Sequence, residues 1–191
     1  MILDIIQKEH VNMAALLKFL DAKLNDLKED RSIRYDFIKD IIDYLHDYAD
    51  KHHHPCEDLI YEYYLEKTQG HQDEIHQLAV QHQKISELTQ RLSDMTEMIL
   101  MDAVVPQQQY IDALSEFLYV QTSHLNYEED NIIPMLREEL TNDDWDAILK
   151  LLPYDGVSDV DSLEELAKKA DPLFGTQVSE RYKPLHQTLH G

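Results

Sequence analysis

Two widely separated segments of the chain carry the same pair of side chains that can bind a metal. His53 is followed by Glu57 four residues later, and His124 is followed by Glu128 at the same spacing. Side chains four residues apart on a helix lie about 40° apart around its axis, so each pair projects from one face. One such pair is common on helix surfaces. Two copies, each followed by apolar residues and close to a proline, predict a metal site.

A single histidine stands upstream of each pair, within an internal repeat. Glu9-His10-x-x-Met13-x-x-Leu16 matches Gln81-His82-x-x-Ile85-x-x-Leu88. The separation from His10 to His53 is 43 residues, and that from His82 to His124 is 42. Two helix pairs related by a pseudo-twofold axis would bring these side chains together in the middle of a bundle. The predicted metal ligands are His10, His53, Glu57, His82, His124 and Glu128.

This set of side chains indicates which metals can bind. Histidine and carboxylate together suit iron or manganese, whereas six ligands without a thiolate exceed what tetrahedral zinc requires. Each carboxylate can bridge two ions, which leaves two histidines for each ion. With an oxo or hydroxo bridge added, a coordination position stays open for oxygen, nitric oxide or peroxide. The alternative is a purely structural bundle, but two inward glutamates would then lack a partner for their charge.

Four long amphipathic segments must position these ligands. Apolar residues recur every three or four positions, which predicts helices over residues 2–27, 33–67, 72–101 and 107–140. Pro55 and Pro134 lie inside two of these segments and are expected to kink them. The fold class is therefore all-α, an up-down-up-down four-helix bundle over residues 1–140. Residues 141–191 are expected to form short helices packed on the bundle, as an extension of the same domain.

The composition of the chain limits the classes of partner that it can bind and the cellular compartment in which we expect it. The chain has 191 residues, a formal charge of −21 and one cysteine. Such an acidic chain is repelled by nucleic acid and by anionic membranes, and a single cysteine excludes an internal disulfide. No signal peptide or membrane-spanning segment is recognisable. We expect a cytoplasmic protein that binds neither nucleic acid nor membrane. The sequence does not decide between a monomer and a homodimer.

The order of ligands distinguishes the chain from ferritin-like diiron proteins, which use Glu-x-x-His. The motifs resemble those of the hemerythrin-like HHE cation-binding proteins. The resemblance rests on Glu9-His10, on residues 53–61, on Gln81-His82 and on residues 124–134. Residues 143–145 and 171–175 are similar to a C-terminal extension of one bacterial branch. The resemblance implies a non-haem diiron site, with roles in oxygen binding, in oxygen or nitric oxide sensing, or in repair of damaged iron centres.

One feature departs from the oxygen-carrying members. They have a second ligand histidine four residues from the first on the third helix, where this chain has Leu78 and Ser86 around His82. With two histidines each, both irons are expected to offer an open or water-filled position. His54 is expected to face solvent or a neighbouring helix, with ligation as its alternative. Tyr61 is expected to donate a hydrogen bond to a carboxylate or a bound ligand.

The sequence thus predicts two iron ions, joined by an oxo or hydroxo bridge, as the cofactor. The predicted function is to bind or sense a small diatomic ligand, oxygen or nitric oxide. Two alternatives use the same ligands: an enzyme that reduces peroxide or nitric oxide, and an iron-handling or iron-centre repair protein. No separate catalytic residue and no organic cofactor are predicted.

Overall fold

The computed structural model describes residues 2–68 and 70–152, and these residues form helices without any strand. The elements, in chain order, are α1 (Ile2–Lys28), α2 (Tyr35–Tyr48), the π-helical turn η1 (Ala49–His53), α3 (His54–Lys67), α4 (Gln72–Leu100), α5 (Gln107–Tyr127), the π-helical turn η2 (Glu128–Ile132), α6 (Ile133–Glu139) and α7 (Asn142–Leu151). The prediction of an all-α fold is confirmed.

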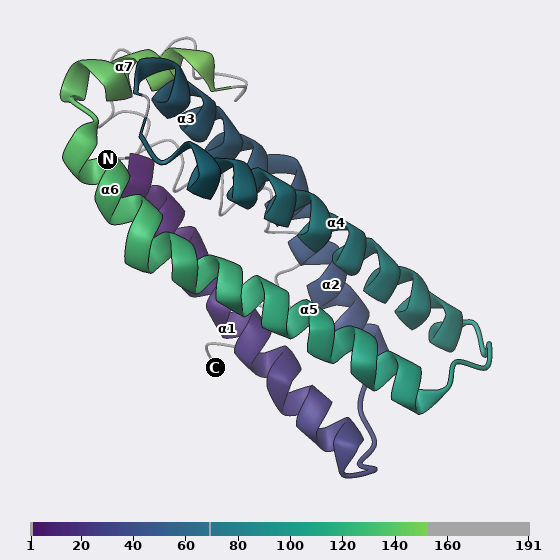
Figure 1. Ribbon diagram of the computed structural model, residues 1–191. Helices are drawn as coiled ribbons and strands as arrows, with labels where there is room; N and C mark the ends of the chain where they lie inside the picture. The colour runs from purple at the N-terminus through teal and green to yellow at the C-terminus, as the bar shows by residue number, and fades with distance from the viewer. Residues whose placement is uncertain (1, 69, 153–191) are drawn as a thin grey trace.

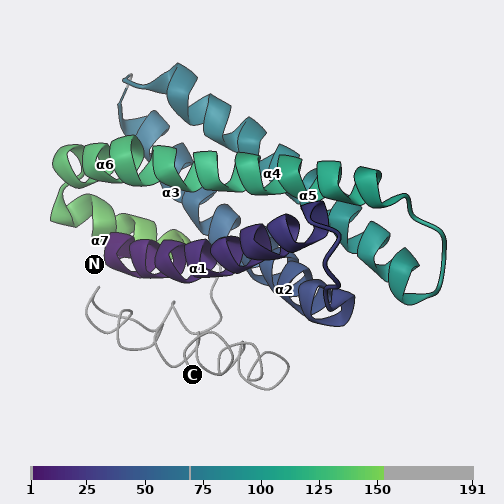
Figure 2. The ribbon, with the colours of Figure 1, turned by 90° about the horizontal axis from the view of Figure 1, so that it is seen from below.

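Four long rods make the bundle, and they run alternately up and down (Figure 1). The first rod is α1, the second is α2 continued through η1 into α3, the third is α4, and the fourth is α5 continued through η2 into α6. Within the bundle α1 packs against α5, α5 against α4, and α4 against α2. Figure 2 shows α1 lying alongside the fourth rod. Each repeated half of the sequence therefore supplies two consecutive rods.

The apolar core is divided into two layers. One layer lies toward the α1–α2 and α4–α5 connections and includes Leu20, Ile42 and Phe117. The other surrounds the opposite end and includes Ile60 and Trp145. Along each rod the predicted ligands fall between residues of the two layers, so the polar cluster is enclosed by apolar side chains at both ends.

Each of the two prolines follows a π-helical turn. The N–H of His54 bonds to the carbonyl of Ala49, and that of Ile133 bonds to the carbonyl of Glu128, both five residues back. Proline has no N–H to donate and its ring crowds the carbonyl four residues earlier, so an α-helical register is unfavourable there. The wider turn accommodates Pro55 and Pro134 within otherwise continuous rods. The kink expected at each proline thus takes the form of a π turn.

The helix α7 closes one end of the bundle (Figure 1). A capping box between Thr141 and Asp144 starts it, and the buried Trp145 joins the second apolar layer. Asp144 also accepts a hydrogen bond from Tyr63 and pairs with Lys67, both on α3. The rest of the predicted C-terminal extension, from residue 153 onward, lies outside the described residues. Among the described helices, none combines the length and the apolar character that crossing a membrane requires.

Candidate metal centre

The structure brings all six predicted ligands together in the middle of the bundle. His10 comes from α1, His53 from the end of η1, and Glu57 from α3. The other half of the repeat contributes His82 from α4, with His124 and Glu128 from the fourth rod. Each of the six is buried, with at most 5% of its surface exposed.

The four predicted histidines meet as two pairs. Nε2 of His10 lies 3.0 Å from Nε2 of His53, and Nε2 of His82 lies 3.1 Å from Nε2 of His124. Where the ring proton of each imidazole lies on the outer Nδ1, two Nε2 lone pairs face each other at this distance, which is unfavourable. A proton or a metal ion between the two nitrogens removes this repulsion.

The two glutamates connect the pairs. Glu57 Oε1 lies 3.2 Å from Nε2 of His10 and 3.3 Å from Nε2 of His53, while its Oε2 lies 3.6 Å from Nε2 of His82. One carboxylate oxygen thus faces each pair.

Glu128 is placed between the same two pairs. Its Oε2 lies 3.1 Å from Nε2 of His124 and 3.5 Å from Nε2 of His10. Its Oε1 lies 3.6 Å from Nε2 of His82. The two carboxylates therefore stand where they can each contact two ions.

The outer nitrogen of each histidine, Nδ1, forms a hydrogen bond with a polar side chain. The partners are equivalent residues in the two halves of the sequence repeat. His53 Nδ1 donates to Glu9 Oε2 at 2.6 Å, and His124 Nδ1 donates to Gln81 Oε1 at 3.0 Å. Glu9 and Gln81 are equivalent residues, each directly before a predicted ligand.

The other two histidines, His10 and His82, also have partners at equivalent positions of the repeat. His10 Nδ1 donates to Glu129 Oε1 at 2.7 Å, and His82 Nδ1 donates to Asp58 Oδ1 at 2.7 Å. Asp58 and Glu129 each follow a predicted glutamate ligand. Since a carboxylate accepts the Nδ1 proton, the Nε2 lone pair of each imidazole is directed inward, as metal ligation requires.

The electrostatics of the cluster also call for positive charge. Burial opposes protonation of His53, yet Glu57 and Glu9 prevail and raise the pKa of His53 well above its ordinary value. Burial likewise opposes a charge on His82, but hydrogen bonds to Asp58 and Glu128 raise its pKa to about 10. Burial lowers the pKa of His124 to about 4. One imidazole of this second pair therefore carries the proton in the absence of a metal.

The carboxylates fit a metal ion for a further reason. Glu57 Oε2 and Glu128 Oε2 are buried and have no hydrogen-bond partner. Among the described residues, the ion pairs found for Glu57 and Glu128 are with histidines only. Buried carboxylate oxygens are costly unless a cation or a donor faces them. The mixed imidazole and carboxylate set suits iron or manganese.

Three further residues, Tyr61, His46 and Cys56, lie beside the cluster. Tyr61 donates a hydrogen bond to Glu128 Oε1 at 2.7 Å, as predicted. Burial, together with the negative charge of Glu128, raises the pKa of Tyr61 well above its ordinary value. His46 is half-buried and contacts Asp50, with 3.1 Å between Nδ1 and Oδ2. Cys56 is buried in the second apolar layer.

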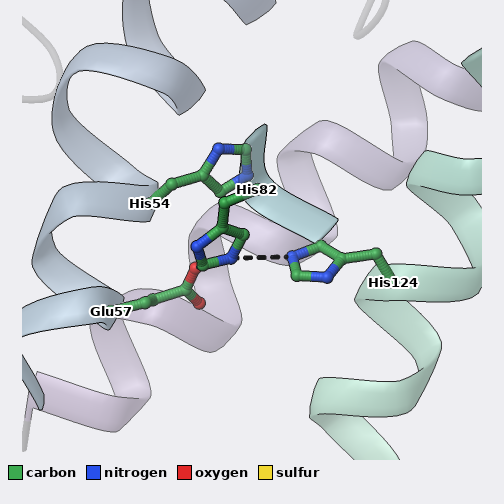
Figure 3. Close-up of side chains that lie close together, drawn as sticks. All are labelled: His54, Glu57, His82 and His124. Carbon is green, nitrogen blue, oxygen red and sulfur yellow. Dashed lines mark hydrogen bonds and ion pairs between the residues drawn. The ribbon is translucent and has the colours of Figure 1, made fainter. Parts of the chain in front are cut away.

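Sequence reasoning left His54 out of the predicted ligand set, but the structure places it inside the cluster. His52 is exposed, whereas His54 is 3% exposed and its ring stacks on that of His82. One ligand atom each from His54, Glu57, His82 and His124 lies within 4.8 Å of the others. Figure 3 shows these four side chains converging from three rods. The signal in the sequence was the run of three histidines, His52 to His54, directly before Pro55.

Comparison with known proteins identifies the family. Residues 1–136 match the family described as hemerythrin, hemerythrin HHE cation binding domain. No curated protein and no solved structure matched the chain. The match covers every predicted ligand and all four rods except the last residues of α6. With its helical bundle and its buried histidine and glutamate cluster, the chain belongs to the hemerythrin HHE cation-binding family.

Proposed function

We propose that the chain holds two iron ions in the cluster and binds or senses a small diatomic ligand, oxygen or nitric oxide. The observation that carries the proposal is the position of Glu57, whose two oxygens face different histidine pairs. Glu128 stands between the same pairs. This arrangement offers each of two ions a pair of imidazoles and a share of two bridging carboxylates.

Each group of residues has a separate role in this proposal. His10 and His53 hold one ion, and His82 and His124 hold the other. Bound iron supplies a redox-active centre that can coordinate a small ligand. The apolar layers at both ends of the cluster exclude bulk water, and the outer hydrogen bonds keep every imidazole in the tautomer that ligation needs.

Binding can be tested on protein loaded with ferrous iron under anaerobic conditions. Stoichiometric oxygen, nitric oxide or peroxide is added, and the optical spectrum and the release of iron to a chelator are followed. The proposal predicts a spectral change that saturates near one ligand per site without continued consumption. Continued consumption would instead identify an enzyme, and transfer of iron to the chelator on exposure would identify an iron-handling protein. An unchanged spectrum would contradict the proposal.

One contact favours the enzyme as a second candidate. The Tyr61 hydroxyl is buried beside Glu128, and its hydrogen bond to Oε1 of Glu128 positions its proton at the edge of the cluster. Reduction of peroxide or nitric oxide consumes protons, and a positioned donor accelerates such steps. If the protein turns over, Tyr61→Phe should slow turnover without loss of iron. Equal turnover in the two proteins would remove the support that Tyr61 gives to this candidate.

The remaining parts of the proposal concern the surroundings of the protein. A cytoplasmic location agrees with the presence of a single, buried cysteine. The strong negative charge agrees with a partner that is a small neutral molecule rather than a polyanion.

A further inference from the structure

We propose that His54 is a third histidine ligand on the side of His82 and His124, so that the two metal positions are unequal. The inference rests on the proposed two-metal function and adds to it where the diatomic ligand binds. The metal with three histidines is more fully coordinated. An exogenous ligand then binds at the metal held by His10 and His53.

The position of His54 is the first support. Its ring lies 4.3 Å from that of His82, centroid to centroid, with only 14° between their planes. The ring of His124 stands nearly perpendicular to it, at 5.7 Å and 86°. Figure 3 shows His54 and His82 close together, with His124 approaching from the opposite side.

The two ring nitrogens of His54 are the second support. Nε2 is buried and has no hydrogen-bond partner. Nδ1 lies 3.3 Å from Oδ1 of Asp50, a carboxylate whose side chain is only 6% exposed. The other four imidazoles show the same division, with a polar side chain outside and Nε2 inside. A carboxylate beside the outer nitrogen is the usual companion of a histidine that ligates a metal.

The π turn explains why two adjacent histidines enter one site. Neighbouring residues on an α-helix lie about 100° apart, so both rarely reach the same centre. Here η1 ends at His53, Pro55 follows, and His53 and His54 are both buried while His52 is exposed. Such π turns occur frequently at functional sites.

The sequence repeat shows that the extra ligand is one-sided. If His53 is equivalent to His124, then His54 is equivalent to Leu125, a buried apolar residue that cannot bind metal. The second π turn begins at Glu128, the second residue of its ligand pair, whereas the first π turn ends at His53, the first residue of its pair. The half of the repeat that contains His124 therefore has no counterpart of His54. With both glutamates shared, the metal beside His10 and His53 has four protein ligands, and the metal beside His82 and His124 has five. We therefore infer unequal irons in place of the two equally open irons expected from the sequence.

The test compares His54→Ala with His52→Ala, a matched change of the exposed neighbour. Iron affinity is measured by competition with a chelator, and nitric oxide is titrated into the reduced protein. Wild type and His52→Ala should bind one nitric oxide per two irons. His54→Ala should hold one of its two irons at least about tenfold more weakly and take up a second nitric oxide. Added imidazole should reverse both effects by filling the space left by the side chain.

Identical affinity and nitric oxide stoichiometry in His54→Ala and His52→Ala would overturn the inference. If His54→Ala does not fold, His54→Gln keeps a side chain of similar length and is measured in the same way. Cobalt(II) separates this inference from the proposed function, because its binding requires neither iron nor a diatomic ligand. If native protein lacks iron, the proposed function is disproved. Weaker binding of one cobalt ion by His54→Ala would still support the assignment of His54 as a ligand. Unchanged cobalt binding contradicts it.

Discussion

Glu9 accepts a hydrogen bond from His53, with 2.6 Å between Oε2 and Nδ1. The equivalent contact in the other half of the repeat joins Gln81 to His124. The chain thus uses a carboxylate in one half and an amide in the other for the same task. Both orient an imidazole and fix its tautomer.

This relationship predicts the behaviour of two Glu9 variants. Glu9→Ala should weaken metal binding roughly 10–100-fold, because His53 loses the acceptor that orients it. Glu9→Gln should retain most of the affinity, since Gln81 performs the same task with an amide. Competition with a chelator measures both. Equal losses in the two variants would show that the charge of Glu9 matters rather than the hydrogen bond.

The assignment of both glutamates as bridges predicts the result of removing their charges. The double variant Glu57→Gln, Glu128→Gln should lose at least one metal ion per chain, because neutral amides cannot balance two cations in a buried site. The matched control is Glu62→Gln, Glu138→Gln, which removes the same charge from exposed positions on α3 and α6. Metal analysis of the purified proteins gives the result. Full occupancy in the first variant would disprove the bridging assignment.

Metal removal should destabilise the bundle. Without metal, two carboxylates and the surrounding histidines remain buried among the rods, and only protons compensate their charge. A metal that binds the folded chain alone adds about 4 kcal/mol when its free concentration is a thousandfold above its Kd. Thermal unfolding of chelated and reloaded protein should therefore differ in Tm. The Glu57→Gln, Glu128→Gln variant should show a smaller difference, and an equal Tm for both forms of wild type would refute this site.

Acid should remove the contribution that Asp144 makes to the docking of α7. Hydrogen bonds with Lys67 and Thr141 hold the pKa of this carboxyl well below its usual range, although burial opposes them. Its stabilising effect is thus complete above the unfolded pKa of about 3.9 and declines as the pH falls below it. At neutral pH Asp144→Asn should cost up to about 1 kcal/mol, because a neutral amide cannot form the ion pair with Lys67.

Urea unfolding at several pH values measures this difference. The stability of wild type minus that of Asp144→Asn should shrink as the pH falls below about 4. The exposed Asp143→Asn in the same helical turn is the control and should differ little from wild type at any pH. A difference that stays constant down to low pH would show that the charge of Asp144 contributes nothing.

Much of the fold followed from sequence because helix periodicity is a local property. The four rods begin and end within two residues of the predicted bounds, and the repeat correctly indicated that His10, His53, His82 and His124 would meet. The repeat also contains Glu9 and Gln81, but their role as hydrogen-bond acceptors for His53 and His124 was not predicted. Each supports a histidine of the following rod, and this contact depends on how the rods pack.

His54 could not be assigned from spacing alone. A prediction based on 3.6 residues per turn turns His54 away from the face of His53, because it assumes a regular helix. Pro55 signalled an interruption, but its form, a π turn ending at His53, depends on how the backbone relaxes inside the bundle. The form of the interruption at Pro134 was equally open, and there η2 begins at Glu128, the second ligand of its pair.

The central claim is that two metal ions lie between the two halves of the repeat. Anomalous diffraction from crystals of the loaded protein, measured at the absorption edge of iron, tests it most directly. The account predicts two peaks inside the bundle, about 3.5–4 Å apart, one beside His10 and His53 and the other beside His82 and His124. Glu57 should contact both. A single peak, or peaks outside this cluster, would contradict the account.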